Sequence, residues 1–340
     1  MKIAIDKNSL KALDNENEFI YLFEDEKLED LLKVGVNCLY YDKCPYVDIN
    51  LTNYDVECFK KAKITEKNWD KLPEKVNYKI GIIIPNCNYE HTIEKCLNSI
   101  ATQTYKNYEV IFVDDMSTDN SVKIAHKFVD KLSNIKIVEL KQKRMNGGAR
   151  NEGYLYLSDD VDYVYYIDSD DWLYDDEALE NINNKLQDRP DVLFVGMANY
   201  KDGKVETCFI PNYKDRYDAI KGWSGSCGKV IKKRLATRQE CLYNEGTLKE
   251  DRNQHCKICI YMDDFKLLKK PVYVWNRENY KSTTTIREKV VWGTSTIRHY
   301  ADTLQLYLSV KGRDKKIDEY LEERVEKTKK EVENGGDKQW

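Results

Sequence analysis

The chain has no long apolar run, no clear excess of either charge sign and no regular spacing of its cysteines. A membrane-spanning helix needs about 20 mostly apolar residues, so the first absence predicts that no helix crosses a membrane. The amino terminus, MKIAIDKNSL, also lacks the apolar core of a signal peptide. These absences favour a cytoplasmic protein and leave peripheral attachment to the inner face of a membrane open.

The charge balance argues against a nucleic-acid-binding domain. The chain has 55 Lys and Arg residues against 59 Asp and Glu residues, and its formal net charge is −4. Nucleic-acid-binding domains usually carry a strong positive charge over one face. The composition therefore makes nucleic acid an unexpected partner, although it leaves a local basic patch open.

The ten cysteines do not form a disulfide framework, and we expect reduced thiols, as is usual in the cytosol. The tightest pair, Cys256 and Cys259, follows His255. A structural zinc site needs four ligands, which usually come from two such pairs. No second pair stands at a suitable spacing, so the sequence does not predict zinc.

A length of 340 residues allows one large domain with additions, or two domains. Residues 1–77 alternate short apolar runs with acidic stretches and are expected to form a small α/β region of unknown role. A polar stretch with a proline precedes residue 78. We expect the main domain over residues 78–285 and a helical extension over residues 286–340.

Strand patterns and helical patterns alternate in the first part of the main domain. Strands are expected over residues 79–85, 108–114, 135–140 and 162–167, and helices over residues 90–103, 119–132 and 147–157. This alternation predicts a Rossmann-like α/β fold, with a mainly parallel sheet covered by helices. Ligands bind such sheets beyond the carboxyl ends of the strands, so the residues that follow each strand are the candidates for a site.

Carboxylates cluster after the strand that ends at residue 167. Asp168 and Asp170 lie two residues apart, so their side chains share one face of an extended backbone. Close carboxylates repel each other unless a cation lies among them, and hard oxygen ligands select Mg²⁺ or Mn²⁺. Together with Asp171 they predict a metal site that stabilises a departing diphosphate. An acidic turn that caps the next helix is the alternative.

Two further positions are candidates for ligand contact. Asp115 follows the second strand and could accept hydrogen bonds from a nucleobase or ribose, whereas we expect Asp119 to cap a helix. Gly147 and Gly148 would let the backbone approach an anion at a helix N-terminus. Arg150 could reach a phosphate or pair with one of the aspartates, and the sequence does not decide between these two roles.

Six short segments, which come in a fixed order within about 90 residues, resemble the large family of inverting glycosyltransferases called family 2. They are Ile82–Tyr89, Cys96–Ile100, Gln103–Tyr105, Val113–Asp119, Gly148–Asn151 and Tyr166–Asp171. The resemblance implies a GT-A fold, Mn²⁺ or Mg²⁺, and a nucleoside-diphosphate sugar as donor, with a UDP-sugar as the first candidate. It also implies a donor half over residues 78–172 and an acceptor half over residues 173–285.

The resemblance further implies roles for single residues. Asp115 would contact the base, Asp168 the ribose or sugar, and Asp170 the metal, with Asp168 as a second metal ligand. Asp171 would contact the sugar. The other residues expected at the donor site are Pro85, Asn86, Asn88, Arg150, Ser169, Lys229, Arg277 and Ser282.

An inverting transfer needs a general base that removes the proton of the acceptor hydroxyl. The family keeps this base in a Glu-Asp pair, which Glu250 and Asp251 match. We expect Asp251 to be the base and Glu250 its neighbour or a second contact with the acceptor, although acids also favour a helix start on their own. The expected reaction moves a hexose or N-acetylhexosamine to a hydroxyl of a surface or capsule polysaccharide, a glycolipid or a glycoprotein.

Three alternative functions remain. A glycosyltransferase that modifies hydroxylated DNA bases would need a basic acceptor face. A nucleotidyltransferase would carry a glycine-rich basic loop after the first strand, and residues 86–89 do not form one. A catalytically silent binding module would have lost Asp170 or the Glu250-Asp251 pair. The basic cluster that a DNA acceptor would use comprises Lys229, Lys232, Lys233, Arg234 and Arg238.

The C-terminal region is expected to be helical and densely charged. A helix over residues 286–311 would present one apolar face, and residues 313–334 follow with many charges of both signs. We expect packing or self-association there, so a homo-oligomer formed through these helices is open. The expected face comprises Ile297, Tyr300, Ala301, Leu304 and Leu308.

Overall fold

The computed structural model describes residues 76–132, 134–247, 249–278 and 289–334, together with four short strands before residue 76. The chain divides into two compact units, each described by itself. The first comprises residues 1–76 with 187–189, and the second comprises residues 77–186 and 190–340.

The first unit contains a four-stranded sheet in the order β2-β1-β4-β3. Strand β1 pairs with β2 in parallel and with β4 in antiparallel fashion, and β3 pairs with β4 in antiparallel fashion. The strands are β1 (Lys2–Ala4), β2 (Phe19–Tyr21), β3 (Asn37–Tyr41) and β4 (Cys44–Asp48).

The second unit is built on a nine-stranded sheet, as far as its described residues show. The order is β7-β6-β5-β8-β12-β10-β13-β9, and β11 pairs with β10. The strands are β5 (Ile80–Asn86), β6 (Tyr108–Asp114), β7 (Ile135–Glu139), β8 (Tyr163–Tyr166), β9 (Trp172–Leu173), β10 (Val192–Lys201), β11 (Lys204–Phe209), β12 (Lys229–Lys232) and β13 (Phe265–Asn276). The helices are α4 (Ile93–Ala101), α5 (Ser121–His126), α6 (Met145–Tyr154), α7 (Ala178–Leu186), α8 (Arg216–Lys221), α9 (Lys233–Ala236), α10 (Glu250–Tyr261), α11 (Lys289–Val310) and α12 (Lys315–Glu333).

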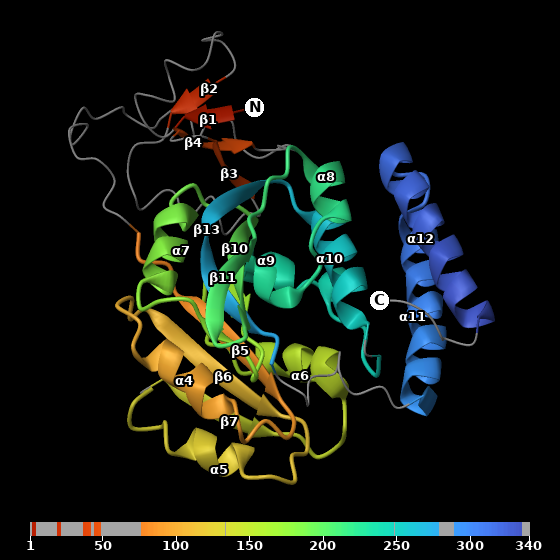
Figure 1. Cartoon of the computed structure of the whole chain (residues 1–340). Coiled ribbons are helices and arrows are strands. Elements are labelled where there is room, and N and C mark those ends of the chain that lie inside the picture. The colour runs from red at the N-terminus through yellow and green to blue at the C-terminus, as the bar shows by residue number, and fades with distance from the viewer. Residues whose placement is uncertain are drawn as a thin grey trace. The chain divides into compact units, whose positions relative to one another are not determined.

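Strands β7, β6, β5 and β8 pair in parallel, as the sequence predicts for the donor half. Every residue of β5 and β6 is buried, because helices cover this part of the sheet. Helix α6 packs on β5 and β6 (Figure 1). It comes so close that a Cβ at Gly153, near the end of α6, would lie 2.6 Å from the Ile83 side chain of β5.

The acceptor half of the sheet is mixed rather than parallel. Strand β12 runs antiparallel to both β8 and β10, and β9 runs antiparallel to β13, while β10 and β13 pair in parallel. The expected mainly parallel arrangement therefore holds for the donor half only. The short 3-10 helix η2 (Ser226–Gly228) leads directly into β12.

Helices α11 and α12 lie beside α10 (Figure 1). The buried face of α11 differs from the expected one, since Ile297 and Leu308 are 57% and 63% exposed while His299 and Thr303 are buried. The reason is that α10 offers a polar surface here, where Asn253 Oδ1 accepts a hydrogen bond of 3.1 Å from Thr303 Oγ1. None of the described helices is both long enough and apolar enough to cross a bilayer.

The hairpin of α11 and α12 also contributes apolar side chains to the core. Leu306 and Val310 of α11, and Leu321 and Val325 of α12, are buried in one cluster with residues of α10. Burying a side chain of this size contributes about 1.5–3 kcal/mol. These residues are used inside the chain, so an oligomer formed through the C-terminal helices stays a prediction.

Candidate active site

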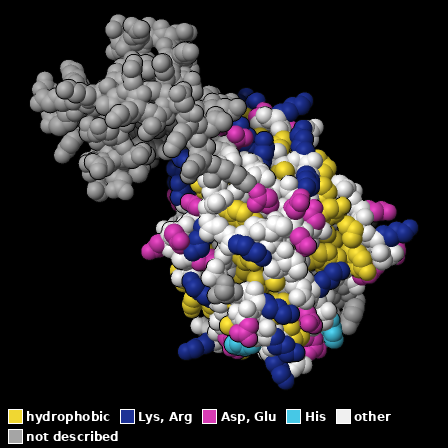
Figure 2. All heavy atoms as spheres, turned by 90° about the vertical axis from the view of Figure 1, so that its left-hand side faces the viewer, with side chains coloured by type: hydrophobic (Ala, Val, Ile, Leu, Met, Phe, Trp, Pro, Cys, Tyr) yellow, Lys and Arg dark blue, Asp and Glu magenta, His cyan; other side chains and the backbone are white. Residues whose placement is uncertain are grey.

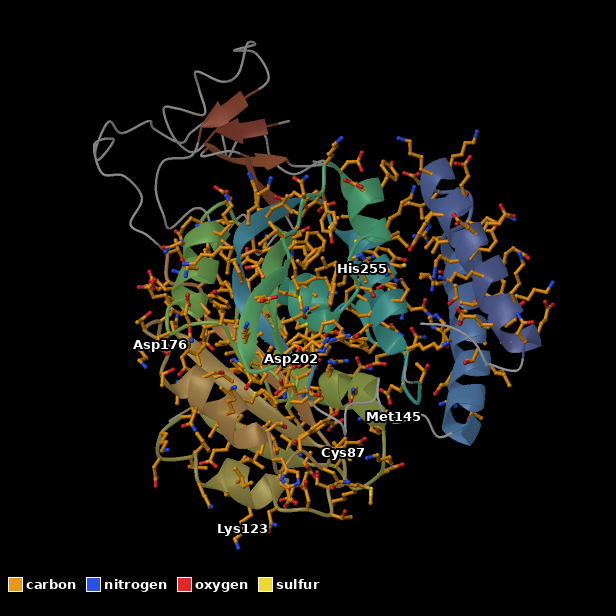
Figure 3. All side chains as sticks on the ribbon, viewed as in Figure 1. Cys87, Lys123, Met145, Asp176, Asp202 and His255 are labelled. Carbon is orange, nitrogen blue, oxygen red and sulfur yellow. The ribbon has the colours of Figure 1, made fainter. Side chains whose placement is uncertain are left out.

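The carboxyl ends of β5, β6 and β8 form one edge of the sheet, tied together by hydrogen bonds. The Asn86 carbonyl accepts from the Asp115 amide at 2.8 Å, and the Asn86 side chain donates to Asp114 Oδ1 at 2.7 Å. Ser169, just after β8, donates to the Pro85 carbonyl at 2.6 Å. In Figure 3, Cys87, directly after β5, and Met145, the first residue of α6, are labelled at this edge.

Three non-glycine residues of these loops have a left-handed backbone. They are Asn88 with φ of 63°, Met116 with φ of 61° and Met145 with φ of 60°. Such residues are uncommon and cluster at functional sites. The Asn88 side chain accepts from the Thr118 amide at 2.7 Å, so Asn88 joins the loops after β5 and β6. Contact of Pro85, Asn86 or Asn88 with a donor stays a prediction.

Asp115 is buried and caps the start of α6. Its carboxylate accepts hydrogen bonds from the amides of Arg144 at 2.7 Å and Met145 at 2.8 Å. Lys143 Nζ lies 3.5 Å from the same carboxylate. The sequence predicts a ligand contact for Asp115 and a helix cap for Asp119, at a different helix. The structure shows that Asp115 caps α6, so contact with a base would have to use its remaining lone pairs.

The paired glycines of α6 face protein, in contrast to the expected approach of a ligand. A Cβ at Gly147 would lie 2.7 Å from the Asn244 carbonyl oxygen, and one at Gly148 would lie 2.4 Å from Arg144 Cβ. Their small size lets the loop around Asn244 pack on the first turn of α6. The Asp115 carboxylate lies at the same turn. The anion at the N-terminus of α6 is therefore a side chain of the protein.

We expect Asp115→Ala to destabilise the protein without any ligand. Removing a helix cap costs about 0.5–2 kcal/mol, and here two partly buried amides would lose their acceptor. Thermal melting of the nucleotide-free variant checks this expectation. An unchanged melting temperature together with weaker nucleotide binding would assign Asp115 to the ligand alone.

Arg150 connects the donor half with the acceptor half. Its guanidinium donates to Asp168 Oδ1 at 2.7 Å and to Glu250 Oε1 at 2.9 Å, and it lies 3.5 Å from Asp251 Oδ1. Only 2% of its side chain is exposed. Of the two roles left open by the sequence, the structure shows pairing with the acids.

The charges around Arg150 decide its protonation. Burial alone would lower the pKa of Arg150, but the charges of Asp168, Asp251 and Glu250 outweigh burial and raise this pKa well above its ordinary value. Three carboxylates around one guanidinium leave an excess of negative charge. A further cation is therefore favoured at this edge of the sheet.

The three aspartates after β8 have different surroundings. The Asp168 side chain is 31% exposed, and the whole Asp170 residue is 8% exposed. Asp171 is buried and accepts hydrogen bonds from the Tyr273 hydroxyl and, at 2.8 Å, from the Asn276 amide. The Asp171 carboxylate thus anchors the end of β13. This structural role accounts for an acid at this position even if Asp171 does not contact a sugar.

Burial separates the two members of the Glu-Asp pair at the start of α10. The Glu250 side chain is 5% exposed, and burial followed by the charge of Asp251 raises the pKa of Glu250. The Asp251 side chain is 38% exposed. Asp251 is therefore the more accessible acid, in keeping with its predicted role as the base.

Two residues that the sequence did not mark are linked to Asp251, one directly and one through the other. Ser226 Oγ donates to Asp251 Oδ1, and the Tyr243 hydroxyl donates to Ser226 Oγ at 2.7 Å. Ser226 lies in η2 and Tyr243 in the loop before α10. No local pattern marks either residue, because the contacts span 25 and 17 residues of sequence.

Lys229 is fully buried, and its ammonium group binds backbone carbonyls. Its ammonium donates to the carbonyls of Ser224 at 3.0 Å and Gly225 at 2.8 Å, and burial lowers its pKa to about 8. It therefore holds the turn that contains Ser226. Arg277 is exposed, with its guanidinium 4.1 Å from the centre of the Trp275 ring, while Ser282 lies outside the described residues.

The basic residues that a DNA acceptor would need are engaged within the chain. Lys232 and Arg234 pair with Asp191, Arg238 pairs with Glu240, and Lys233 donates to the Ser158 carbonyl. On the face shown in Figure 2, basic and acidic side chains of the described residues are interspersed. These contacts weaken the case for a nucleic-acid acceptor.

His255, Cys256 and Cys259 do not form a zinc site. His255, labelled on α10 in Figure 3, lies with Nε2 2.8 Å from the Ala219 carbonyl oxygen. Both cysteines are free thiols. Within the described part of the chain, no three His, Cys, Asp or Glu side chains are grouped so that they could hold a metal by themselves.

The fold is that of known GT-A glycosyltransferases. Residues 1–349 of Staphylococcus aureus TarS, in complex with UDP-GlcNAc, superpose with a TM-score of 0.56 at 21% identity, over 67% of this chain and 70% of that fragment. The mannosyltransferase PcManGT from Pyrobaculum calidifontis, in complex with GDP-Man and Mn²⁺, gives a TM-score of 0.50 at 16% identity, over 80% of this chain and 77% of PcManGT. At these identities the likeness shows the fold.

The sequence model described as "Glycosyl transferase family 2" matches residues 81–273, which is more than half of the chain. The protein belongs to this family, as its motifs predict. GlyA of Streptococcus pneumoniae serotype 4 is 29% identical over 219 residues, 59% of this chain and 31% of GlyA. The Escherichia coli glucosyltransferase WfgD is 37% identical over 131 residues, 38% of this chain and 47% of WfgD. The chain thus matches less than half the length of either relative.

Proposed function

We propose that the protein is a metal-dependent, inverting glycosyltransferase that uses a nucleoside-diphosphate sugar, with a UDP-sugar as the first candidate. The supporting observation is that Arg150 brings Asp168 of the donor half together with Asp251 of the acceptor half. TarS was crystallised with UDP-GlcNAc, and the name of WfgD begins with UDP-Glc. The acceptor is a hydroxyl of a glycan, a glycolipid or a protein.

The residues of the site fit a shared metal ion. Mg²⁺ and Mn²⁺ are usually held by one or two carboxylates together with substrate phosphates. Asp168 and Asp170 supply two carboxylates next to an excess of negative charge, so they would be the protein ligands. When bound, the ion would neutralise charge on the departing diphosphate.

The remaining chemistry belongs to the acceptor half. The acceptor oxygen attacks the anomeric carbon from one face, and the bond from that carbon to the diphosphate breaks on the other face. Because attack and departure take place on opposite faces of this carbon in one step, the configuration inverts. Asp251 takes the proton of the attacking hydroxyl. Arg150 keeps Asp251 close to the donor acids, and buried Glu250 holds Arg150 in place.

A thermal-shift panel with UDP, GDP, CDP and dTDP, each with and without Mn²⁺, tests the donor site. A ligand that binds only the folded state raises the melting temperature. At a ligand concentration 100 times the dissociation constant, the free energy of unfolding rises by about 2.7 kcal/mol. We expect UDP to stabilise the protein more with Mn²⁺ than without it. Asp170→Asn should lose this Mn²⁺-dependent part of the shift.

The matched control is Asp159→Asn, which removes an exposed acid outside the proposed site. This variant should keep the full shift with UDP and Mn²⁺. If Asp170→Asn responded to Mn²⁺ as strongly as the control, the metal would lie elsewhere. If no nucleotide raised the melting temperature of the wild type, the proposed function would be wrong.

A further inference from the structure

Two hydroxyl groups form a chain that ends on the carboxylate of Asp251. Ser226 Oγ lies between Tyr243 and Asp251, 2.7 Å from the Tyr243 hydroxyl. An ionised carboxylate only accepts hydrogen bonds, so Ser226 must donate its single proton to Asp251. Ser226 can then only accept from Tyr243, and the direction of both hydrogen bonds is fixed.

The hydroxyl chain is buried at one end and open at the other. Tyr243 is 4% exposed and Ser226 is 1% exposed, whereas the Asp251 side chain is 38% exposed. Oδ1 of Asp251 accepts the hydrogen bond from Ser226 and lies next to Arg150. Oδ2 accepts no hydrogen bond from any described residue. The carboxylate is thus held by one oxygen, which leaves the other available to an incoming proton.

The Tyr243 hydroxyl is not needed to hold its own loop. The Tyr243 backbone is already held by Asn151, whose side chain accepts from the Tyr243 amide at 2.9 Å and donates to its carbonyl at 3.0 Å. The ring packs edge-on against Tyr166 with centroids 5.5 Å apart, and its centre lies 5.2 Å from Arg150 Cζ. The hydroxyl therefore adds a polar contact to a ring that is already fixed.

We infer that Ser226 and Tyr243 are positioning residues that orient the Asp251 carboxylate for proton transfer. This inference rests on the proposed function, in which Asp251 is the base. Ser226 holds Oδ1 of the carboxylate and Tyr243 holds Ser226, so the two hydroxyls together fix the direction in which Oδ2 points.

Other charged and titratable groups also surround Asp251 and remain in place when a hydroxyl is removed. They come from four elements besides α10 and act on the carboxylate in every variant. They are Arg150 on α6, Tyr166 on β8, Cys227 in η2, Lys229 on β12 and, within α10, Glu250.

The thermal-shift panel first identifies the nucleotide that binds. The test then measures the release of nucleoside diphosphate from a sugar donor that carries this nucleotide, in the presence of Mn²⁺ and with water as the acceptor. Water attacks the anomeric carbon, the bond to the diphosphate breaks, and Asp251 takes the proton. We expect Tyr243→Phe to lower kcat about 3–10-fold. KM for the donor should stay unchanged, because neither hydroxyl belongs to the proposed donor site.

Two variants at Ser226 separate the hydroxyl from the packing. Ser226→Ala removes a hydrogen bond to a charged group, which corresponds to about a 10–100-fold loss in kcat. Ser226→Thr keeps a hydroxyl at this position and should recover most of the loss. Equal activity of the alanine and threonine variants would contradict a positioning role.

Tyr154→Phe is the matched control. Tyr154 packs edge-on against the same Tyr166 ring with centroids 6.2 Å apart, but its buried hydroxyl has no partner among the described residues. Its kcat should match that of the wild type. If Tyr243→Phe and Tyr154→Phe had equal kcat values while Asp251→Asn was inactive, the inference alone would be overturned. An active Asp251→Asn variant would overturn the proposed base as well.

Discussion

Replacing Asp251 with Asn is expected to slow sugar transfer by about 10²–10⁴-fold, the range in which general base catalysis contributes. The amide keeps the size of the side chain but cannot take a proton. Asp251 is the more exposed acid at the start of α10, and its Oδ2 receives no hydrogen bond from the described residues. Steady-state release of the nucleoside diphosphate measures the effect.

Donor binding distinguishes a lost base from a damaged site. Calorimetric titration with the nucleoside diphosphate and Mn²⁺ should give the same dissociation constant for Asp251→Asn as for the wild type. Asp263→Asn serves as the control, since Asp263 is exposed just beyond the other end of α10. A rate for Asp251→Asn close to that of the control would assign the base to another residue.

The second large effect concerns stability, and we expect it at Arg150. Arg150→Met should lower the free energy of unfolding by about 3–5 kcal/mol, because removing one partner of a buried ion pair leaves the others unpaired. Glu250, which is 5% exposed, would keep its burial and lose its guanidinium partner. Denaturant unfolding of the nucleotide-free protein measures the change.

Arg144→Met is the control for this prediction. Arg144 also bridges two carboxylates, those of Glu152 and Glu245, but its side chain is 30% exposed. Ion pairs in contact with solvent contribute about 0–1 kcal/mol, so this variant should unfold nearly like the wild type. Equal losses in the two variants would mean that burial does not set the strength of the Arg150 pairs.

Much of the donor half could be predicted from the sequence, because its signals are local. The apolar runs of β5 and β6 and the spacing of Ile93, Cys96, Leu97 and Ile100 in α4 define elements that the structure confirms. The ends of β5, β6 and β8, where the candidate site residues lie, are linked at one edge of the sheet, because parallel strands all end on the same side.

The partners of these residues could not be predicted, because they depend on tertiary contacts. Arg150 meets Glu250 across 100 residues of sequence, and Asp171 meets Tyr273 across 102. The mixed acceptor half follows from antiparallel pairings that leave no periodic signal. The position of Asp115 after a strand predicts a ligand contact, yet its carboxylate caps α6. The sequence cannot separate these two roles, because both use the same carboxylate oxygens.

The salt bridges of Arg150 have a consequence for engineering. A chimera that joins residues 78–172 to the acceptor half of another enzyme would inherit Arg150 without Glu250 and Asp251. The guanidinium would then be buried with Asp168 as its one remaining acidic partner. The two halves are therefore exchangeable only as a matched pair, or with a partner that supplies a carboxylate at the position of Glu250.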